Sequence, residues 1–158
     1  MKSELNLIIT SLEQVLSGEP WYGRSVYDII ANAEAGRVYE RPGNNPHSQA
    51  DLLFHMLTWT EFTRDRLLGT PIEDMEAFAK MDWRRIDEHG SGDNAWAHGV
   101  EQFRKANDEI LSILRNKDEA FLDERVDYRE YDFRYLLHGL IDHHVYHTGQ
   151  LAYLQKTL

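Results

Sequence analysis

The chain ends in FRYLLHGLIDHHVYHTGQLAYLQKTL, residues 133–158, a stretch with the pattern of one long amphipathic helix. Its leucines recur at the three- and four-residue spacing that places side chains on one face of an α-helix. Three histidines fall within the same arc. Because a buried imidazole is costly unless it has a polar partner, this pattern indicates a polar site inside an apolar core. The residues on this face are Leu136, Leu140, His143, His144, His147, Leu151, Leu154 and Leu158.

Three other stretches show the same periodicity, and the four together predict a helical bundle. They cover residues 5–16, 48–68 and 94–115, and a capping box marks the start of the second. Shorter helices are predicted at 26–33 and 73–80. Polar and charged residues fill the segment before the last helix, and no segment alternates like a strand. The predicted fold class is therefore all-α, an antiparallel four-helix bundle with additional short helices.

Length and composition limit the classes of function. A chain of 158 residues is long enough for one domain, and we expect residues 1–158 to form a single unit. The net charge of −10 and the lack of a basic tract argue against nucleic acid and anionic membranes as partners. No apolar run approaches the roughly 20 residues of a spanning helix, and the N-terminus lacks the pattern of a secretory signal. A cytoplasmic location is the expectation.

The histidines are the residues that point to chemistry. Eight histidines and no cysteine mean that a transition-metal site must use imidazole and carboxylate ligands. His143 and His147 are four residues apart and lie one helical turn above the other, while His55 supplies a third imidazole from the apolar face of another helix. Three neutral imidazoles form the open ligand set of a catalytic Zn²⁺ or a similar divalent metal. The alternative is that these histidines are structural and bind no metal, since a single H-x-x-x-H pair is a weak motif.

Several known motifs are missing, which narrows the predicted site to one metal ion. The zincin pattern needs a glutamate directly after the first histidine, but a second histidine follows His143. No Glu-x-x-His occurs, so the di-iron signature of ferritin-like bundles is absent. The P-loop, the dinucleotide fingerprint and the G-x-S-x-G elbow are absent as well.

Two further polar residues are second-tier candidates for the site. Gln150 lies one turn beyond His147 on the same side, where it either orients a ligand or a bound water, or bonds a neighbouring helix. Asn107 is the polar residue on the apolar face of the 94–115 helix, where it either faces the site or bonds a backbone group. The sequence names no acid–base residue.

The remaining polar residues near these motifs receive structural interpretations. His144 is predicted to be a satisfied core histidine or a donor behind the ligands, in preference to a metal ligand. Asp51 lies one turn before His55 and could accept its free N–H, but its place in the capping box is a sufficient structural reason for it. The other histidines are expected to be solvated and receive no role: His47, His89, His98 and His138.

The two histidine motifs resemble those of the DinB-like superfamily. Residues 137–151, LHGLIDHHVYHTGQL, are similar to its C-terminal H-x-x-Y-H-x-G-Q-I signature. Residues 47–59, HSQADLLFHMLTW, are similar to its segment with a serine, a leucine, a histidine and a tryptophan at fixed spacing. Residues 19–23, EPWYG, resemble the P-W-x-G turn of one branch, which is not specific by itself. The resemblance covers nearly the whole chain in order and spacing.

This resemblance carries its own expectations. The superfamily consists of metal-binding four-helix proteins that include bacillithiol S-transferases and the metal-binding domain of mycothiol-dependent maleylpyruvate isomerases. Its ligand triad corresponds to His55, His143 and His147 of this chain, and the position of His144 usually carries another polar residue. The resemblance implies a homodimer and a divalent metal, commonly Zn²⁺ or Ni²⁺, with water in the open positions.

The leading hypothesis is a metal-dependent transferase or hydrolase acting on a small molecule, with a low-molecular-weight thiol or water as the nucleophile. A second hypothesis, from a different class, is a dimeric bundle that binds a metal or small ligand without catalysis, as a sensor or structural protein.

Overall fold

A computed structural model describes residues 3–87 and 94–158, which form six α-helices and one 3-10 helix. Within these residues β-structure is limited to an isolated bridge between Arg125 and Asp132. The all-α prediction is therefore confirmed. The elements in chain order are α1 (Glu4–Ser17), α2 (Val26–Ala31), α3 (Gln49–Leu68), α4 (Met75–Met81), α5 (Ala95–Leu114), η1 (Glu119–Asp123) and α6 (Phe133–Thr157).

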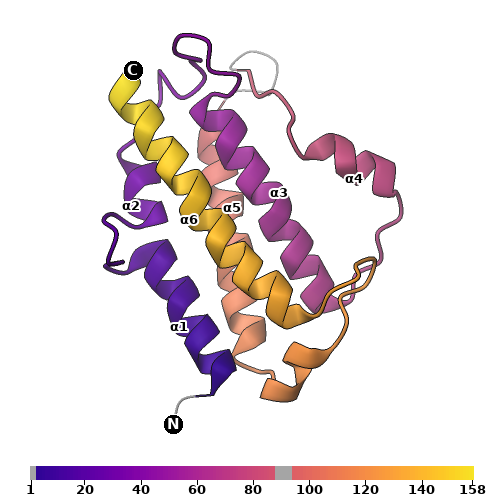
Figure 1. Cartoon of the computed structure of the whole chain (residues 1–158). Helices are drawn as coiled ribbons and strands as arrows, with labels where there is room; N and C mark the ends of the chain where they lie inside the picture. Colours follow the sequence, from indigo (N-terminus) through magenta and orange to yellow (C-terminus); the bar gives the residue numbers. More distant parts are fainter. Residues whose placement is uncertain (1–2, 88–93) are drawn as a thin grey trace.

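The four long helices form two parallel pairs that run in opposite directions (Figure 1). α1 and α6 point one way, and α3 and α5 point the other way. The parallel course of α3 and α5 follows from contacts at both ends. Near their starts, the Trp96 backbone N–H donates to the Tyr39 hydroxyl and the Ala50 N–H to the Val38 carbonyl. Near their ends, Arg64 pairs with Glu109 at 3.5 Å. Residues 69–87, which follow α3 and contain α4, lie along the outside of the bundle (Figure 1).

Local signals position α3, the helix that carries His55. Ser48 accepts a hydrogen bond from the Asp51 N–H, and the Asp51 carboxylate accepts one from the Ser48 N–H, which completes the predicted capping box. The helix ends at Gly69, whose φ of 68° is the left-handed conformation that glycine adopts at little cost. The prediction for residues 48–68 is therefore accurate to about a residue at each end.

The bundle core is mostly apolar, and α3 and α5 approach each other closely at Gly99. A Cβ atom added at Gly99 would lie 2.7 Å from the Phe54 ring and 3.3 Å from Leu53, so the glycine allows the two helices to approach closely. The segment before α6 is less polar than expected, because η1 buries Phe121 and Leu122 against the core. Among the described helices, none has the length and apolar character needed to span a membrane.

Candidate metal centre

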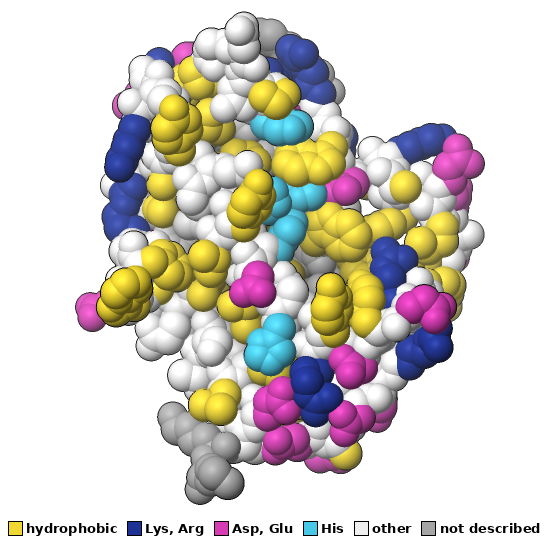
Figure 2. Space-filling view, viewed as in Figure 1, with side chains coloured by type: hydrophobic (Ala, Val, Ile, Leu, Met, Phe, Trp, Pro, Cys, Tyr) yellow, Lys and Arg dark blue, Asp and Glu magenta, His cyan; other side chains and the backbone are white. Residues whose placement is uncertain are grey.

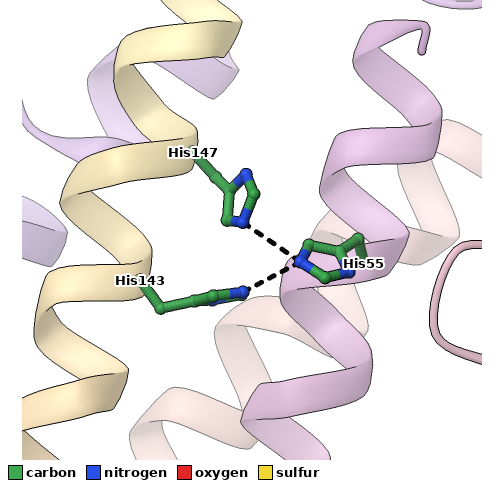
Figure 3. Close-up of side chains that lie close together, drawn as sticks. All are labelled: His55, His143 and His147. Atoms are coloured by element: carbon green, nitrogen blue, oxygen red, sulfur yellow. Dashed lines mark hydrogen bonds between the residues drawn. The ribbon is translucent and has the colours of Figure 1, made fainter. Parts of the chain in front are cut away.

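The three predicted histidines meet between α3 and α6. His55 extends from α3, and His143 and His147 extend from successive turns of α6 (Figure 3). The Nε2 atom of His55 lies 3.0 Å from Nε2 of His147 and 2.9 Å from Nε2 of His143. His55 and His147 are buried, and His143 is half-buried. Helical periodicity together with the four-residue spacing of His143 and His147 therefore identified three side chains that converge through the same ring nitrogen, although 92 residues separate His55 from His147.

The outer nitrogens of two of these rings are held by hydrogen-bond acceptors. Nδ1 of His55 lies 2.6 Å from the Asp82 carboxylate, and Nδ1 of His147 lies 2.6 Å from Oε1 of Gln150. Because both partners accept, we assign the ring hydrogen to Nδ1 in each histidine. Their Nε2 atoms are then unprotonated, and two lone pairs face each other at 3.0 Å. Nδ1 of His143 is buried without a hydrogen-bond partner among the described residues.

Burial keeps the imidazoles neutral. It is the largest cause that lowers the pKa of His147 to about 4 and that of His143 to about 2. Burial also lowers the pKa of His55, although the Asp82 carboxylate acts in the opposite direction. Neutral imidazole is the form that binds metal. Facing lone pairs on neutral rings repel one another unless a cation lies between them.

The donor set fits a metal ion of ordinary size. Tetrahedral Zn–N bonds of about 2.0–2.1 Å separate the ligand nitrogens by about 3.3 Å. The two closest Nε2–Nε2 distances here are 2.9 Å and 3.0 Å, so small side-chain rotations are sufficient to reach that spacing. The three histidines form a group whose ligand atoms all lie within 4.8 Å of one another. The buried triad thus fits a metal-binding site.

Asp82 and Trp83 complete the surroundings of His55, and sequence reasoning missed both. Asp82 follows α4 directly, and its Oδ1 also accepts a hydrogen bond of 2.8 Å from the Trp59 indole. Trp83 stacks on the His55 ring with centroids 3.6 Å apart and on His47 at 4.2 Å. These residues belong to a segment without periodicity. The sequence offered only a weak signal for them: an acid followed directly by a tryptophan in a stretch without helical periodicity.

The second-tier candidates have different roles. Gln150 accepts a hydrogen bond from His147 of its own helix through Oε1, so its role in orienting a ligand or a bound water stays a prediction. Asn107 donates to the Phe103 carbonyl and accepts from Nε2 of the fully buried His144 at 3.1 Å. Asn107 therefore faces His144 instead of the triad. His144 is a core histidine, but only its Nε2 is satisfied, because its Nδ1 is buried without a hydrogen-bond partner among the described residues.

The remaining residues singled out in the sequence mostly follow expectation. Asp51 belongs to the capping box of α3 and does not bond His55. It also forms an ion pair with Arg41, with an N–O distance of 2.7 Å. His98 and His138 are exposed as predicted. The prediction for His47 is wrong, because this ring is half-buried and stacks on Trp83. His89 lies outside the described residues.

A model of the DinB superfamily matches residues 24–151, which include the whole triad. The chain belongs to the DinB superfamily. Comparison with curated proteins and with solved structures gives no match. The family assignment therefore agrees with the resemblance of the two histidine motifs, and it covers α2 to most of α6.

Two pockets lie beside the triad of this DinB-superfamily chain. Histidine side chains are visible at the centre of the face that α6 presents, bordered by hydrophobic side chains (Figure 2). The first pocket, of about 140 Å³, has His143 in its wall. The second, of about 320 Å³, is lined by Gln150, which holds His147, and by His47. The first pocket therefore reaches the triad at His143, and the second reaches Gln150, the partner of His147.

Proposed function

We propose that the protein is a metal-dependent enzyme that transfers a small electrophile to a low-molecular-weight thiol. The observation that carries this proposal is the convergence of three imidazoles through their Nε2 atoms, with the outer nitrogens of His55 and His147 held by Asp82 and Gln150. Three protein ligands leave an open position, as in catalytic rather than structural zinc sites. Zn²⁺ and Ni²⁺ are the proposed metals, since imidazole suits both.

A divalent metal held by His55, His143 and His147 would lower the pKa of a bound thiol or water toward neutrality and so would supply a nucleophile. In the proposed reaction, a thiol R–SH and an electrophile R′–X give R–S–R′ and HX. The S–C bond forms, the C–X bond breaks, X leaves with the bonding pair, and the thiol proton passes to solvent. Water in place of the thiol gives hydrolysis by the same bond changes.

The chain's own residues have the task of holding this ligand set rigid. The hydrogen bond from His55 to Asp82 fixes both the orientation of the ring and the position of its hydrogen, as carboxylates behind metal-bound histidines do. Gln150 does the same for His147. Stacking of Trp83 on His55 excludes water from one face of that ring.

Elemental analysis of the purified, untagged protein tests the site. We expect about one equivalent of Zn²⁺ or Ni²⁺ per chain in the wild type and none in His55→Ala or His147→Ala. His138→Ala is the matched control, because His138 is an exposed histidine of the same helix as His147. Absence of metal from the wild type after incubation with both ions would overturn the proposal.

A conjugation screen then tests the chemistry. The metal-loaded protein is incubated with cysteine, glutathione and other small thiols against a panel of alkyl and aryl halides. We expect turnover that falls at least a hundredfold in His147→Ala while the circular dichroism spectrum is unchanged. Bound metal without turnover of any thiol or of water would support the alternative, a metal-binding bundle that is a sensor or structural protein.

The homodimer and the cytoplasmic location remain predictions. Light scattering coupled to gel filtration tests the first, with an expected mass of about twice the 18.5 kDa of one chain.

A further inference from the structure

Three glycines lie inside the long helices α5 and α6, and only one of them has a packing reason. Glycine is the poorest helix former after proline, so an interior glycine needs an explanation. Gly99 has one, because a Cβ there would meet Phe54 and Leu53. Gly139 and Gly149 differ, since a Cβ at either position would have no neighbour within 4 Å. Neither has the positive φ that requires glycine.

Both unexplained glycines line the pockets beside the triad. Gly139 lies in the wall of the pocket that contains His143, and Gly149 lies in the wall of the pocket that contains Gln150. Any larger side chain at these positions would extend into the space of the pocket. The two glycines therefore leave space in one pocket that reaches His143 and in another that reaches Gln150, the partner of His147.

The pocket at Gly139 is suited to an uncharged ring. Its volume of about 140 Å³ is close to the roughly 150 Å³ of an apolar cavity that binds benzene. Its surface is almost wholly apolar, and none of the described residues that line it carries a charge at neutral pH, because burial keeps His143 unprotonated. The lining residues are Trp59, Thr63, Tyr131, Tyr135, Leu136, Gly139, Leu140 and His143.

The pocket at Gly149 has a different character. It is larger, about 320 Å³, and hydrogen-bonding side chains form much of its wall. These groups suit a polar molecule of several hydrogen-bonding atoms better than a bare ring. The polar side chains in this wall are Asn45, His47, Tyr146, Gln150 and Tyr153.

We propose that the Gly139 pocket binds an uncharged, ring-sized apolar group of the electrophile, and that the Gly149 pocket receives the polar thiol. This inference rests on the proposed function. A ring seated against His143 places the carbon attached to it beside the triad, while the thiol arrives from the opposite side. The sulfur then bonds that carbon as the leaving group departs, so the two substrates need not compete for one space.

A larger side chain at Gly139 or at Gly149, both in α6, fills one pocket at a time and gives two matched variants. Gly139→Leu and Gly149→Leu place identical side chains in open space, and both substitutions favour the helix, so neither should unfold the protein. The probe for the ring is fluorobenzene, followed by ¹⁹F NMR line broadening with and without Zn²⁺. We expect binding to weaken at least tenfold in Gly139→Leu and to change less than twofold in Gly149→Leu.

Turnover provides the second readout. For a benzyl halide, Gly139→Leu should lower kcat/KM at least tenfold, mainly through KM, whereas for methyl iodide it should have little effect. Gly149→Leu should raise the KM for the thiol with both electrophiles. Equal fluorobenzene binding in wild type and Gly139→Leu, or no binding to the wild type at near-saturating probe, would overturn the inference. Fluorobenzene binding that depends on Gly139, without conjugation of any thiol, would instead contradict the proposed function while leaving the ring pocket in place.

Discussion

α3 packs against α5 on one side and against α6 on the other, and the two interfaces bury different chemistry. Toward α5, Leu53 is fully buried beside Gly99, and the helices meet through apolar contact alone at this point. Toward α6, two residues further along α3, His55 meets two other imidazoles. The α3–α5 interface is stabilised by these apolar contacts without a ligand. The second places the unprotonated Nε2 atoms of His55 and His147 against each other in a buried site, an arrangement that a bound cation would stabilise.

Removal of Leu53 should produce the largest loss of stability. Leu53→Ala leaves a cavity between α3 and α5, and we expect it to lower the free energy of unfolding by about 2–5 kcal/mol. His55→Ala should cost the metal-free protein less, because the repulsion between lone pairs is removed with the ring. Urea denaturation of both variants without metal measures the difference. A larger loss in His55→Ala would contradict the contrast between the two interfaces.

Leucine at two helical glycines should change the free energy of unfolding in opposite directions. Gly99→Leu forces a side chain into the close approach of α3 and α5, with an expected cost of about 1–3 kcal/mol. Gly139→Leu enters open space and should gain about 0.5–1 kcal/mol from helix propensity. Thermal unfolding of the two variants provides the measurement. If both substitutions destabilise the protein, the space beside Gly139 is too small for a leucine side chain.

Loss of the carboxylate behind His55 should weaken metal binding and leave the α3–α5 interface intact. In Asp82→Asn the amide replaces the charged acceptor at Nδ1, and we expect a 10- to 100-fold lower affinity for Zn²⁺. Competition with a chromophoric chelator measures this affinity. Asp142→Asn is the control, because Asp142 is an exposed acid of α6, and its affinity should equal that of the wild type.

The smallest expected effect is a slope of stability with pH. Burial lowers the pKa of His144 to about 3 and that of His147 to about 4, below the ordinary value near 6.5. At a pH between the lowered pKa and 6.5, each of these histidines binds a proton in the unfolded chain but not in the native protein. The free energy of unfolding therefore falls as the pH drops below about 6.5. Each such group contributes up to about 1.4 kcal/mol per pH unit. This stability is fully present above pH 6.5.

His144→Leu tests this in the metal-free protein. We expect a shallower dependence of unfolding free energy on pH between 6.5 and 5 than in the wild type, whatever the change in absolute stability. An unchanged slope would show that His144 does not titrate with unfolding.

The triad was predictable because it depends on a short-range rule. Helical periodicity places His143 and His147 on the face that also carries the leucines, and the same rule places His55 on the apolar face of α3. Membership of the DinB superfamily agrees with that result. Helix ends with side-chain caps, such as Ser48 at α3, were equally predictable, because the capping residues are close together in the sequence.

What the sequence did not reveal depends on tertiary register. Asp82 reaches His55 only because the segment after α4 returns along α3, where its backbone is fixed by the Ile86 N–H donating to Asp51 at 2.7 Å. No periodic signal encodes that path. Likewise, Asn107 and His144 were both found as polar residues on apolar faces, but their pairing requires the relative rotation and height of α5 and α6.

The separation of His55 and His147 has a consequence for the unfolded chain. A metal ion held by both would close a loop that joins two points 92 residues apart, as a reversible cross-link does. A permanent cross-link over about 100 residues removes chain entropy worth about 4.7 kcal/mol in the polymer model of disulfides. Unlike a disulfide, this link would open whenever the metal leaves. The free energy of unfolding would therefore depend on the concentration of free metal, in a protein that has no cysteine with which to form a permanent cross-link.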